Sequence, residues 1–234
     1  MKNTQKEYHK AIDCLCGMVQ SGELAVGSKL PSERAIAEKL SIGRNSTREA
    51  LRVLEIMGMI ECKRGSGNYL CANMSSAISE IIDIMLLLGQ TKTSEVSSFC
   101  RNMDKAVCFE IIEKGNFSES VQLLEKILNQ SQSLLTDDRI TCDKNFHTAL
   151  IEATQNRLWI TFSTALTAVY HRRIEIILKN ADNGTQAQLC KAHNDIVSAL
   201  KEGDREKCEK AINLHYDIVD REFEKIECNK KFDI

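Results

Sequence analysis

The sequence contains no segment that would anchor the chain in a membrane. Its longest apolar stretch runs from Ile81 to Leu88, is interrupted by Asp83, and is too short to span a bilayer. The first ten residues are polar and lead into an amphipathic segment, without the apolar region of a signal peptide. We therefore expect a cytoplasmic protein that does not bind membranes.

Cysteine is frequent, but the spacing that a zinc ribbon needs is missing. There are ten cysteines in 234 residues, and no pair has the C-x2-C spacing, since Cys14 and Cys16 are separated by only one residue. A disulfide scaffold would concentrate its cysteines in a much shorter chain. We expect reduced thiols, most of them buried.

Neither charge nor apolar content is extreme, but the charge is unevenly distributed. With 43% hydrophobic and 27% charged residues the chain can form a normal core, and its length suggests two domains. Residues 1–72 hold 11 Lys and Arg against 8 Asp and Glu, which leaves 20 against 25 for the rest. A positive excess at one end is compatible with a polyanionic partner there.

The N-terminal part predicts a helix-turn-helix. Apolar residues at helical spacing indicate one helix over about 6–20 and a second that Ser32 caps and that ends near Leu40. The short turn 41–43 leads to a third helix, which Gly58 ends. Two helices joined by so tight a turn form this motif.

A hairpin is predicted to follow the third helix. Residues 59–62 and 68–71 are short strand-like runs around the glycine-bearing connection 63–67. Such a hairpin would be the wing of a winged helix-turn-helix. We place this domain at residues 1–72.

Residues 73–234 predict a second, all-helical domain. The single proline, Pro31, lies ahead of it, and apolar residues recur at spacings of three and four between breaks rich in Gly and Asn. Counting between these breaks gives seven helices, without a repeated period. The expected fold is mainly α, with a winged helix-turn-helix followed by an antiparallel bundle of about seven helices.

Three arginines form a stripe on the third helix. Arg44, Arg48 and Arg52 are spaced by four, so they share one face that starts at the positive end of the helix dipole. A guanidinium matches O6 and N7 of guanine in the major groove, so Arg44 and Arg48 are candidates for reading bases. The alternative is a solvated charged face.

The same region resembles the DNA-binding domain of the GntR family over residues 8–71. The resemblance lies in Pro31-Ser-Glu-Arg34, in Arg44-Asn-Ser-Thr-Arg-Glu-Ala-Leu51 and in the wing sequence Arg64-Gly-Ser-Gly67. It implies that arginines matching Arg34, Arg44 and Arg48 contact operator DNA and that the wing tip enters the minor groove. Short polar side chains beside the arginines suit phosphates or base edges. The predicted DNA-binding residues are Ser32, Arg34, Arg44, Asn45, Ser46, Thr47, Arg48, Gly65, Ser66 and Gly67.

One residue departs from the family pattern. Gly43 stands where the family usually has a Ser or Thr that caps the recognition helix. We expect a cap weaker by a few tenths of a kcal/mol.

Four polar residues of the second domain suggest a metal site. Asp143 and His147 are four apart on one predicted helix, and His193 and His215 lie on later ones. One carboxylate and three imidazoles from several bundle helices suit zinc, nickel, manganese or iron. The simpler alternative is a set of hydrogen-bonded core histidines.

This second region resembles the FCD domain of the FadR branch of GntR regulators, through Asp143-x-x-Phe-His147, His193 and Ala211-x-x-x-His215. The resemblance implies a divalent metal, zinc before nickel, manganese or iron, held by Asp143, His147, His193 and His215. It also implies a small carboxylate effector that completes the coordination.

The sequence also offers arginines for the effector. Arg101 stands where the family often has an effector-facing arginine, although Met103 and Asp104 replace the usual Leu and Glu beside it. Arg172 or Arg173 could also meet an anion, and His171 is ambiguous.

The expected function is that of a transcriptional regulator, not an enzyme. A homodimer would bind a palindromic operator, and an effector would change the affinity of the dimer for that operator. In the family, repression that the effector relieves is the commoner mode of regulation. The alternatives are a metal-dependent enzyme, for which no H-E-x-x-H motif is present, and a dimerisation module that a metal only stabilises.

Overall fold

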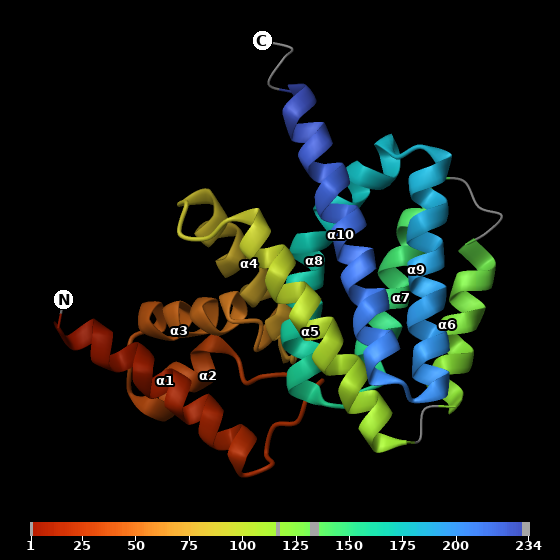
Figure 1. Cartoon of the computed structure of the whole chain (residues 1–234). Helices are drawn as coiled ribbons and strands as arrows, with labels where there is room; N and C mark the ends of the chain where they lie inside the picture. The colour runs from red at the N-terminus through yellow and green to blue at the C-terminus, as the bar shows by residue number, and fades with distance from the viewer. Residues whose placement is uncertain (1, 116–117, 132–135, 231–234) are drawn as a thin grey trace. The chain divides into compact units, whose positions relative to one another are not determined.

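The computed structural model describes residues 2–115, 118–131 and 136–230. The described chain is mostly helical, with one small sheet, so the expected fold class is confirmed (Figure 1). Two compact units, Met1–Ile78 and Ser79–Ile234, are described in turn. The division between them falls inside helix α4, whereas the sequence predicts a boundary just ahead of that helix.

The first unit is a winged helix-turn-helix. Its elements are α1 (Lys2–Gln20), α2 (Glu33–Leu40), α3 (Arg44–Ile56), β1 (Ile60–Lys63) and β2 (Gly67–Leu70). The strands pair antiparallel, with Ile60 opposite Leu70, and each is shifted by one residue from its expected position. The predicted cap of α2 is confirmed, because the Ser32 hydroxyl accepts a hydrogen bond from the Ala35 amide at 3.2 Å.

All elements of this unit contribute to one apolar core. Leu15 of α1, Ile36 of α2 and Leu54 of α3 are almost fully buried, and Ile60 and Leu70 close the core from the wing. Each buried aliphatic side chain contributes about 1.5–3 kcal/mol. The core therefore fixes the orientation of α3 against the other helices.

Seven helices follow the wing in the described part of the chain, as the sequence predicts, and the second unit contains six of them and most of α4. They are α4 (Met74–Leu87), α5 (Thr93–Lys114), α6 (Ser118–Ser131), α7 (Thr136–Glu152), α8 (Arg157–Asn180), α9 (Asn183–Glu202) and α10 (Arg205–Lys230). Helix α10 packs along α9 and α5, and α7 packs between α6 and α8 (Figure 1). Large side chains such as Phe146, Ile174 and Leu200 fill the centre.

The described helices do not include one that is long and apolar enough to cross a membrane. The nine described cysteines are all free thiols. Only Cys100, Cys108 and Cys208 are fully buried, while five are half-buried and Cys62 is exposed, so the expectation that most would be buried is wrong. Burial raises the pKa of the Cys100 thiol, which keeps it protonated.

Gly58 allows the chain to return from the wing past the end of α3. Its φ is +72°, and a Cβ atom there would lie 2.3 Å from the backbone oxygen of Asn73. The Gly58 carbonyl also accepts a hydrogen bond from the Asn73 amide at 3.0 Å. Both the backbone angle and the close approach require glycine.

We expect Gly58→Ala to lower the free energy of unfolding by roughly 3 kcal/mol, because it adds a steric clash to the strain of a positive φ. Gly22→Ala is the matched control, since Gly22 has φ +78° and a Cβ atom there would meet nothing within 4 Å. Denaturant unfolding of both variants measures the difference. Equal losses would show that the contact with Asn73 contributes nothing.

Candidate functional site

The candidate DNA-reading surface is the exposed face of α3 together with the start of α2. Arg44, Arg48 and Arg52 are exposed and follow one face of α3, and Asn45 is exposed beside them. Arg34 is exposed in the first turn of α2. The first turn of α3 has no acidic residue of its own, and the three arginines along this face favour an anion.

Two of these arginines are held by neighbouring carboxylates. The Nε and Nη2 atoms of Arg48 lie 3.2 and 3.1 Å from Oε2 of Glu33. The Nε of Arg34 lies 2.7 Å from Oε1 of Glu38. The side chains of Arg48 and Arg34 remain 53% and 70% exposed, so these pairs are weak and can be exchanged for a stronger anion.

Ser46 and Thr47 do not belong to the exposed surface. Both are almost fully buried. The Ser46 hydroxyl donates to Glu7, and the Thr47 hydroxyl donates to the Gly43 carbonyl at 3.3 Å. Their hydroxyls are used inside the domain, which corrects the expectation that they face phosphates or base edges.

Glu7 provides the cap that Gly43 lacks. Its Oε2 atom accepts hydrogen bonds from the Gly43 amide at 3.3 Å and from the Ser46 hydroxyl at 2.9 Å. A carboxylate at this position also interacts favourably with the positive end of the helix dipole. The start of α3 is therefore fixed by α1, a contact that local sequence could not indicate.

The predicted wing tip is exposed. Gly65, Ser66 and Gly67 lie at and just after the turn between β1 and β2, and Gly65 and Gly67 both have positive φ. The hydroxyls of Ser66 and Tyr69 lie 2.6 Å apart, which braces the hairpin.

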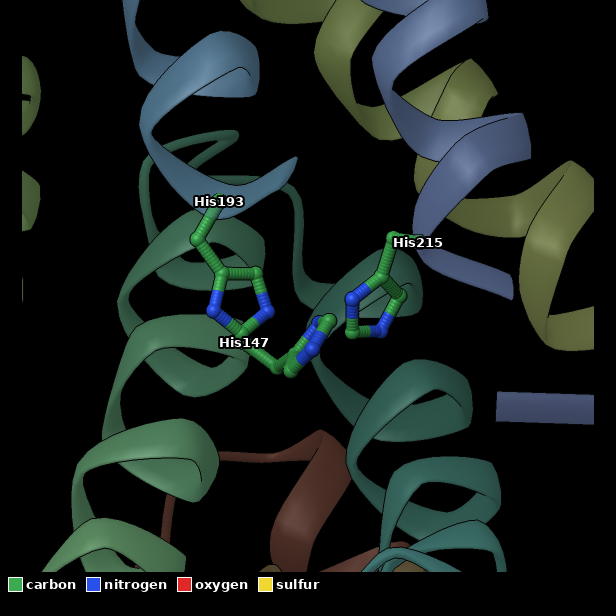
Figure 2. A group of neighbouring side chains, drawn as sticks. All are labelled: His147, His193 and His215. Carbon is green, nitrogen blue, oxygen red and sulfur yellow. The ribbon is translucent and has the colours of Figure 1, made fainter. Parts of the chain in front are cut away.

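The second candidate site is a cluster of buried histidines in the bundle. His147 of α7, His193 of α9 and His215 of α10 each offer a ring nitrogen within 4.8 Å of the others. Figure 2 shows the three rings converging from their separate helices. Their centroids lie 4.7 to 5.4 Å apart, so three residues far apart in sequence share one small space.

Asp143 lies at the edge of this cluster. Its Oδ1 atom is 3.5 Å from Nε2 of His193, and its Oδ2 atom is 3.4 Å from Nε2 of His171. Asp143 thus reaches the cluster through His193, whereas the ligand atoms that lie within 4.8 Å of one another among the described residues belong to the three histidines. His171, which the sequence left ambiguous, joins them from α8.

Several polar atoms of the cluster make no hydrogen bond. Among the described residues, Asp143 Oδ2, the Nε2 atoms of His147, His171 and His193, and both ring nitrogens of His215 are buried and make no hydrogen bond. Leaving one such group unsatisfied costs about 1–3 kcal/mol. Several unsatisfied groups that face one another are difficult to explain as simple core packing, and they form a suitable donor set for a divalent metal.

Asp104 is a member of this site that the sequence did not identify. Its Oδ2 atom lies 3.3 Å from Nδ1 of His147 and accepts a hydrogen bond from the Tyr216 hydroxyl at 2.8 Å. This pairing directs Nε2 of His147 toward the other imidazoles. The only signal in the sequence is a carboxylate among the apolar residues of α5, such as Met103 and Val107.

The electrostatics differ among the imidazoles. Burial lowers the pKa of His193 to about 4 and the pKa of His215 well below its ordinary value, and it also lowers the pKa of His171. Burial opposes protonation of His147 too, but the hydrogen bond and charge of Asp104 outweigh it and raise its pKa. Neutral His193 and His215 keep the lone pairs that a metal ligand needs at neutral pH.

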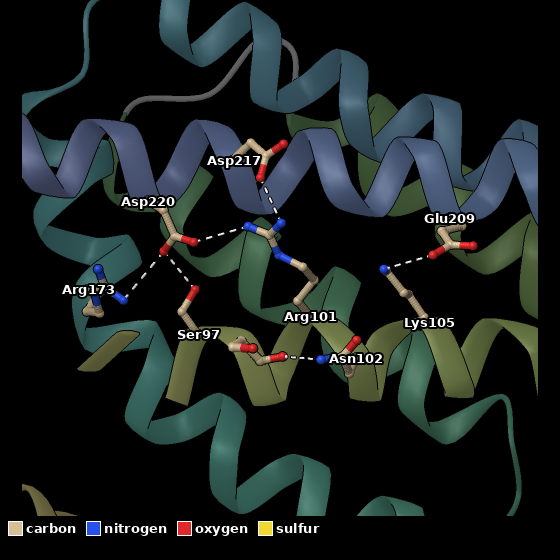
Figure 3. Close-up of polar contacts among 9 residues, drawn as sticks. Ser97, Arg101, Asn102, Lys105, Arg173, Glu209, Asp217 and Asp220 are labelled. Atoms are coloured by element: carbon tan, nitrogen blue, oxygen red, sulfur yellow. Dashed lines mark hydrogen bonds and ion pairs between the residues drawn. The ribbon is translucent and has the colours of Figure 1, made fainter. Parts of the chain in front are cut away.

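The predicted effector arginines do not point into the cluster. Figure 3 shows Arg101 between Asp217 and Asp220 of α10. Its guanidinium nitrogen atoms lie 2.7 Å from Oδ1 of Asp217 and 3.1 Å from Oδ2 of Asp220. Arg172 is half-exposed and pairs with Asp83. Their proposed contacts with an effector remain predictions.

A small cavity of about 40 Å³ opens beside the cluster. Asp143 and His193 form part of its wall, and Arg139 and Gln186, which hydrogen-bond to each other, form another part. The cavity therefore places a guanidinium next to the candidate ligands, at a position that the sequence did not single out.

Both units match known families. Residues 7–70 match "Bacterial regulatory proteins, gntR family", and residues 96–217 match "FCD domain". The Uxu operon regulator of Haemophilus influenzae is 30% identical over 216 residues, which cover 86% of this chain and 76% of that protein. The transcriptional regulator LutR of Bacillus subtilis is 28% identical over 209 residues, which cover 87% of this chain and 94% of that protein.

Two further comparisons agree with these. The repressor NanR of an Enterobacter strain is 25% identical over 210 residues, covering 86% of this chain and 79% of that protein. Among solved structures, a GntR protein of Streptococcus agalactiae has a TM-score of 0.65 at 22% identity, covering 92% and 99% of the two chains. The structural likeness supports the fold.

We expect Glu7→Ala to lower the free energy of unfolding by about 1 kcal/mol, because the cap of α3 is lost. Glu23→Ala, at an exposed position, is the control. Thermal unfolding measures both. If the two variants are equally stable, the contact of Glu7 with Gly43 and Ser46 does not stabilise α3.

Proposed function

Because the chain belongs to the GntR family of bacterial regulators and carries an FCD domain, we propose that it is a repressor whose operator affinity depends on a metal-bound carboxylate. Family membership makes it a DNA-binding transcriptional regulator. The relatives are named as regulators, in agreement with the expectation that the chain is not an enzyme. Repression is favoured because the NanR relative is named a repressor.

Operator DNA would be read by Arg34, Arg44 and Arg48, with Asn45 beside them. The three arginines are exposed. Ion pairs with Glu38 and Glu33 hold the side chains of Arg34 and Arg48 near the helix surface. A bidentate contact with guanine would replace the weak pair with Glu33. Ser32 and the wing tip, Gly65 to Gly67, would contact the backbone and the minor groove.

A divalent ion, zinc before nickel, manganese or iron, would be held by His147, His193, His215 and Asp143. The observation that carries this is the group of buried ring nitrogen atoms that make no hydrogen bond and converge from three helices. The 3.5 Å between Asp143 and His193 is also close to the separation of about 3.4 Å expected for two ligands of a tetrahedral ion. When bound, the ion would attract a carboxylate through its positive charge.

The effector is a small carboxylate that would enter beside the metal. Arg139 lies in the wall of the adjacent cavity and is a better-placed partner for such an anion than Arg172. Arg101 would influence the effector site only indirectly, because its ion pairs with Asp217 and Asp220 hold α10 in place. Effector binding would shift operator affinity by its preference for one conformation.

The regulator would act as a homodimer in the cytoplasm. Ile81, Ile84 and Leu88 expose an apolar face in and just after α4, which supports association with a second copy. Two copies would present two α3 helices to the halves of a palindrome.

Arg48→Ala should weaken binding to an operator obtained by in vitro selection about 10- to 100-fold, because one base contact is lost. The slope of the logarithm of the binding constant against the logarithm of the salt concentration should become smaller in magnitude by about one. Fluorescence anisotropy measures both, with Arg221→Ala, an exposed arginine of the bundle, as control. Unchanged affinity and salt slope in Arg48→Ala would exclude Arg48 from the reading surface.

His147→Ala should abolish stoichiometric zinc binding, and Asp104→Asn should weaken it about 10- to 100-fold, because the ring of His147 loses its orientation. Elemental analysis measures the zinc content of His147→Ala, and competition with a chelator measures the zinc affinity of Asp104→Asn. His9→Ala, which lies outside the cluster, is the control. Full zinc content in His147→Ala would refute the metal site. Metal binding without any response of operator affinity to a panel of carboxylates would instead indicate a purely structural ion.

A further inference from the structure

Asp143 presents its two carboxylate oxygen atoms to two different imidazoles. Its Oδ1 atom lies 3.5 Å from Nε2 of His193, whereas its Oδ2 atom lies 3.4 Å from Nε2 of His171. The side chain of Asp143 is buried, so solvent contributes little to its orientation. A carboxylate can bind an ion with one oxygen while the other accepts a hydrogen bond, and carboxylates that bind metals are usually held in this way.

His171 lies outside the group of three histidines that offers ligand atoms to an ion. Within the described part of the chain, the ligand atoms that lie within 4.8 Å of one another belong to His147, His193 and His215, whose rings Figure 2 draws. The centroid of the His171 ring is 6.4 Å from that of His147, farther than the 4.7 to 5.4 Å that separate the three rings. This position suits a partner of Asp143 better than a further ligand.

His171 can donate a hydrogen bond to Oδ2 of Asp143. Among the described residues, neither this oxygen nor Nε2 of His171 makes a hydrogen bond, and both atoms are buried. An imidazole carries at least one N–H whether or not it is charged, so a donor is available in either state. The separation of 3.4 Å exceeds a good N–H···O distance by only a few tenths of an ångström, so a small rotation of either side chain forms the bond.

We infer that His171 is a positioning residue of the metal site proposed above, on which this inference rests. By donating from Nε2 to Oδ2, His171 fixes the rotation of the Asp143 carboxylate, so that Oδ1 stays on the side of His193 and remains available as a ligand. This role is the counterpart of that of Asp104, whose carboxylate orients the ring of His147. Helix α8, which provides none of the proposed ligands, thereby contributes to the affinity of the site for its ion.

The zinc affinity of the full chain, measured by competition with a chelator, tests this role. His171→Ala should bind zinc about 10- to 100-fold more weakly, because Asp143 loses its orientation. His171→Gln should stay within about threefold of the parent, since its side-chain amide can donate from nearly the same place. His9→Ala removes an imidazole from the first unit and is the control. Unchanged affinity in His171→Ala, or equal losses in the alanine and glutamine variants, would overturn the inference.

A double-mutant cycle distinguishes positioning from direct ligation and from a general loss of packing. If His171 acts through Asp143, adding His171→Ala to Asp143→Ala should weaken zinc binding no further. Additive losses would overturn the inference, because they would show that His171 acts independently of the carboxylate. His171→Leu, which fills most of the space without a donor, replaces the alanine variant if that variant does not fold.

The same titrations separate this inference from the metal site itself. Zinc binding that His147→Ala leaves intact would refute the proposed site. Zinc binding that requires His147 but is unchanged in His171→Ala would refute only the role of His171. Full affinity in Asp143→Ala would remove the carboxylate from the set of ligands, and the role of His171 with it, while leaving the three histidines as ligands.

Discussion

The bundle is organised around a group of polar side chains that apolar packing alone cannot satisfy. Helices α7, α8, α9 and α10 each insert one histidine into the same buried region, and α5 adds Asp104. Each helix must keep its rotation and height for these groups to meet, because a shift of one residue would turn a ring about 100° away. The unsatisfied nitrogen atoms oppose stability in the absence of a ligand, so an ion that satisfied them would stabilise the fold.

The surrounding contacts show how this arrangement is held. Asp104 orients His147 and is itself fixed by Tyr216 of α10, while Arg101 joins α5 to the same helix through two carboxylates. Helix α10 thus contributes His215 to the cluster and also receives the polar contacts that hold it against α5. A movement of α10 caused by a ligand would therefore reach both groups of contacts, which is the type of linkage that a regulator requires.

The DNA-binding domain depends on carboxylates in a different way. Glu7 caps the reading helix from a distant part of the sequence, and Glu33 holds Arg48 near the surface of α3. The first contact is structural, whereas the second is exposed and weak enough to yield to DNA. Acidic residues thus shape a surface whose partner is an anion.

The sequence by itself determined the helix-turn-helix, the wing, the seven-helix bundle and the four residues proposed as metal ligands. The helices and the wing depend on local periodicity and on turn residues such as Gly58, which a linear reading can recognise, whereas the set of proposed ligands follows from the resemblance to the FCD domain. Only the tertiary structure revealed the roles of Glu7 and Asp104, the burial of Ser46 and Thr47, and the separation of Arg172 from the histidines. Most of these features depend on which helices pack together. Glu7 and Gly43, for example, are 36 residues apart, and partners so far apart leave no local pattern from which their contact could be predicted.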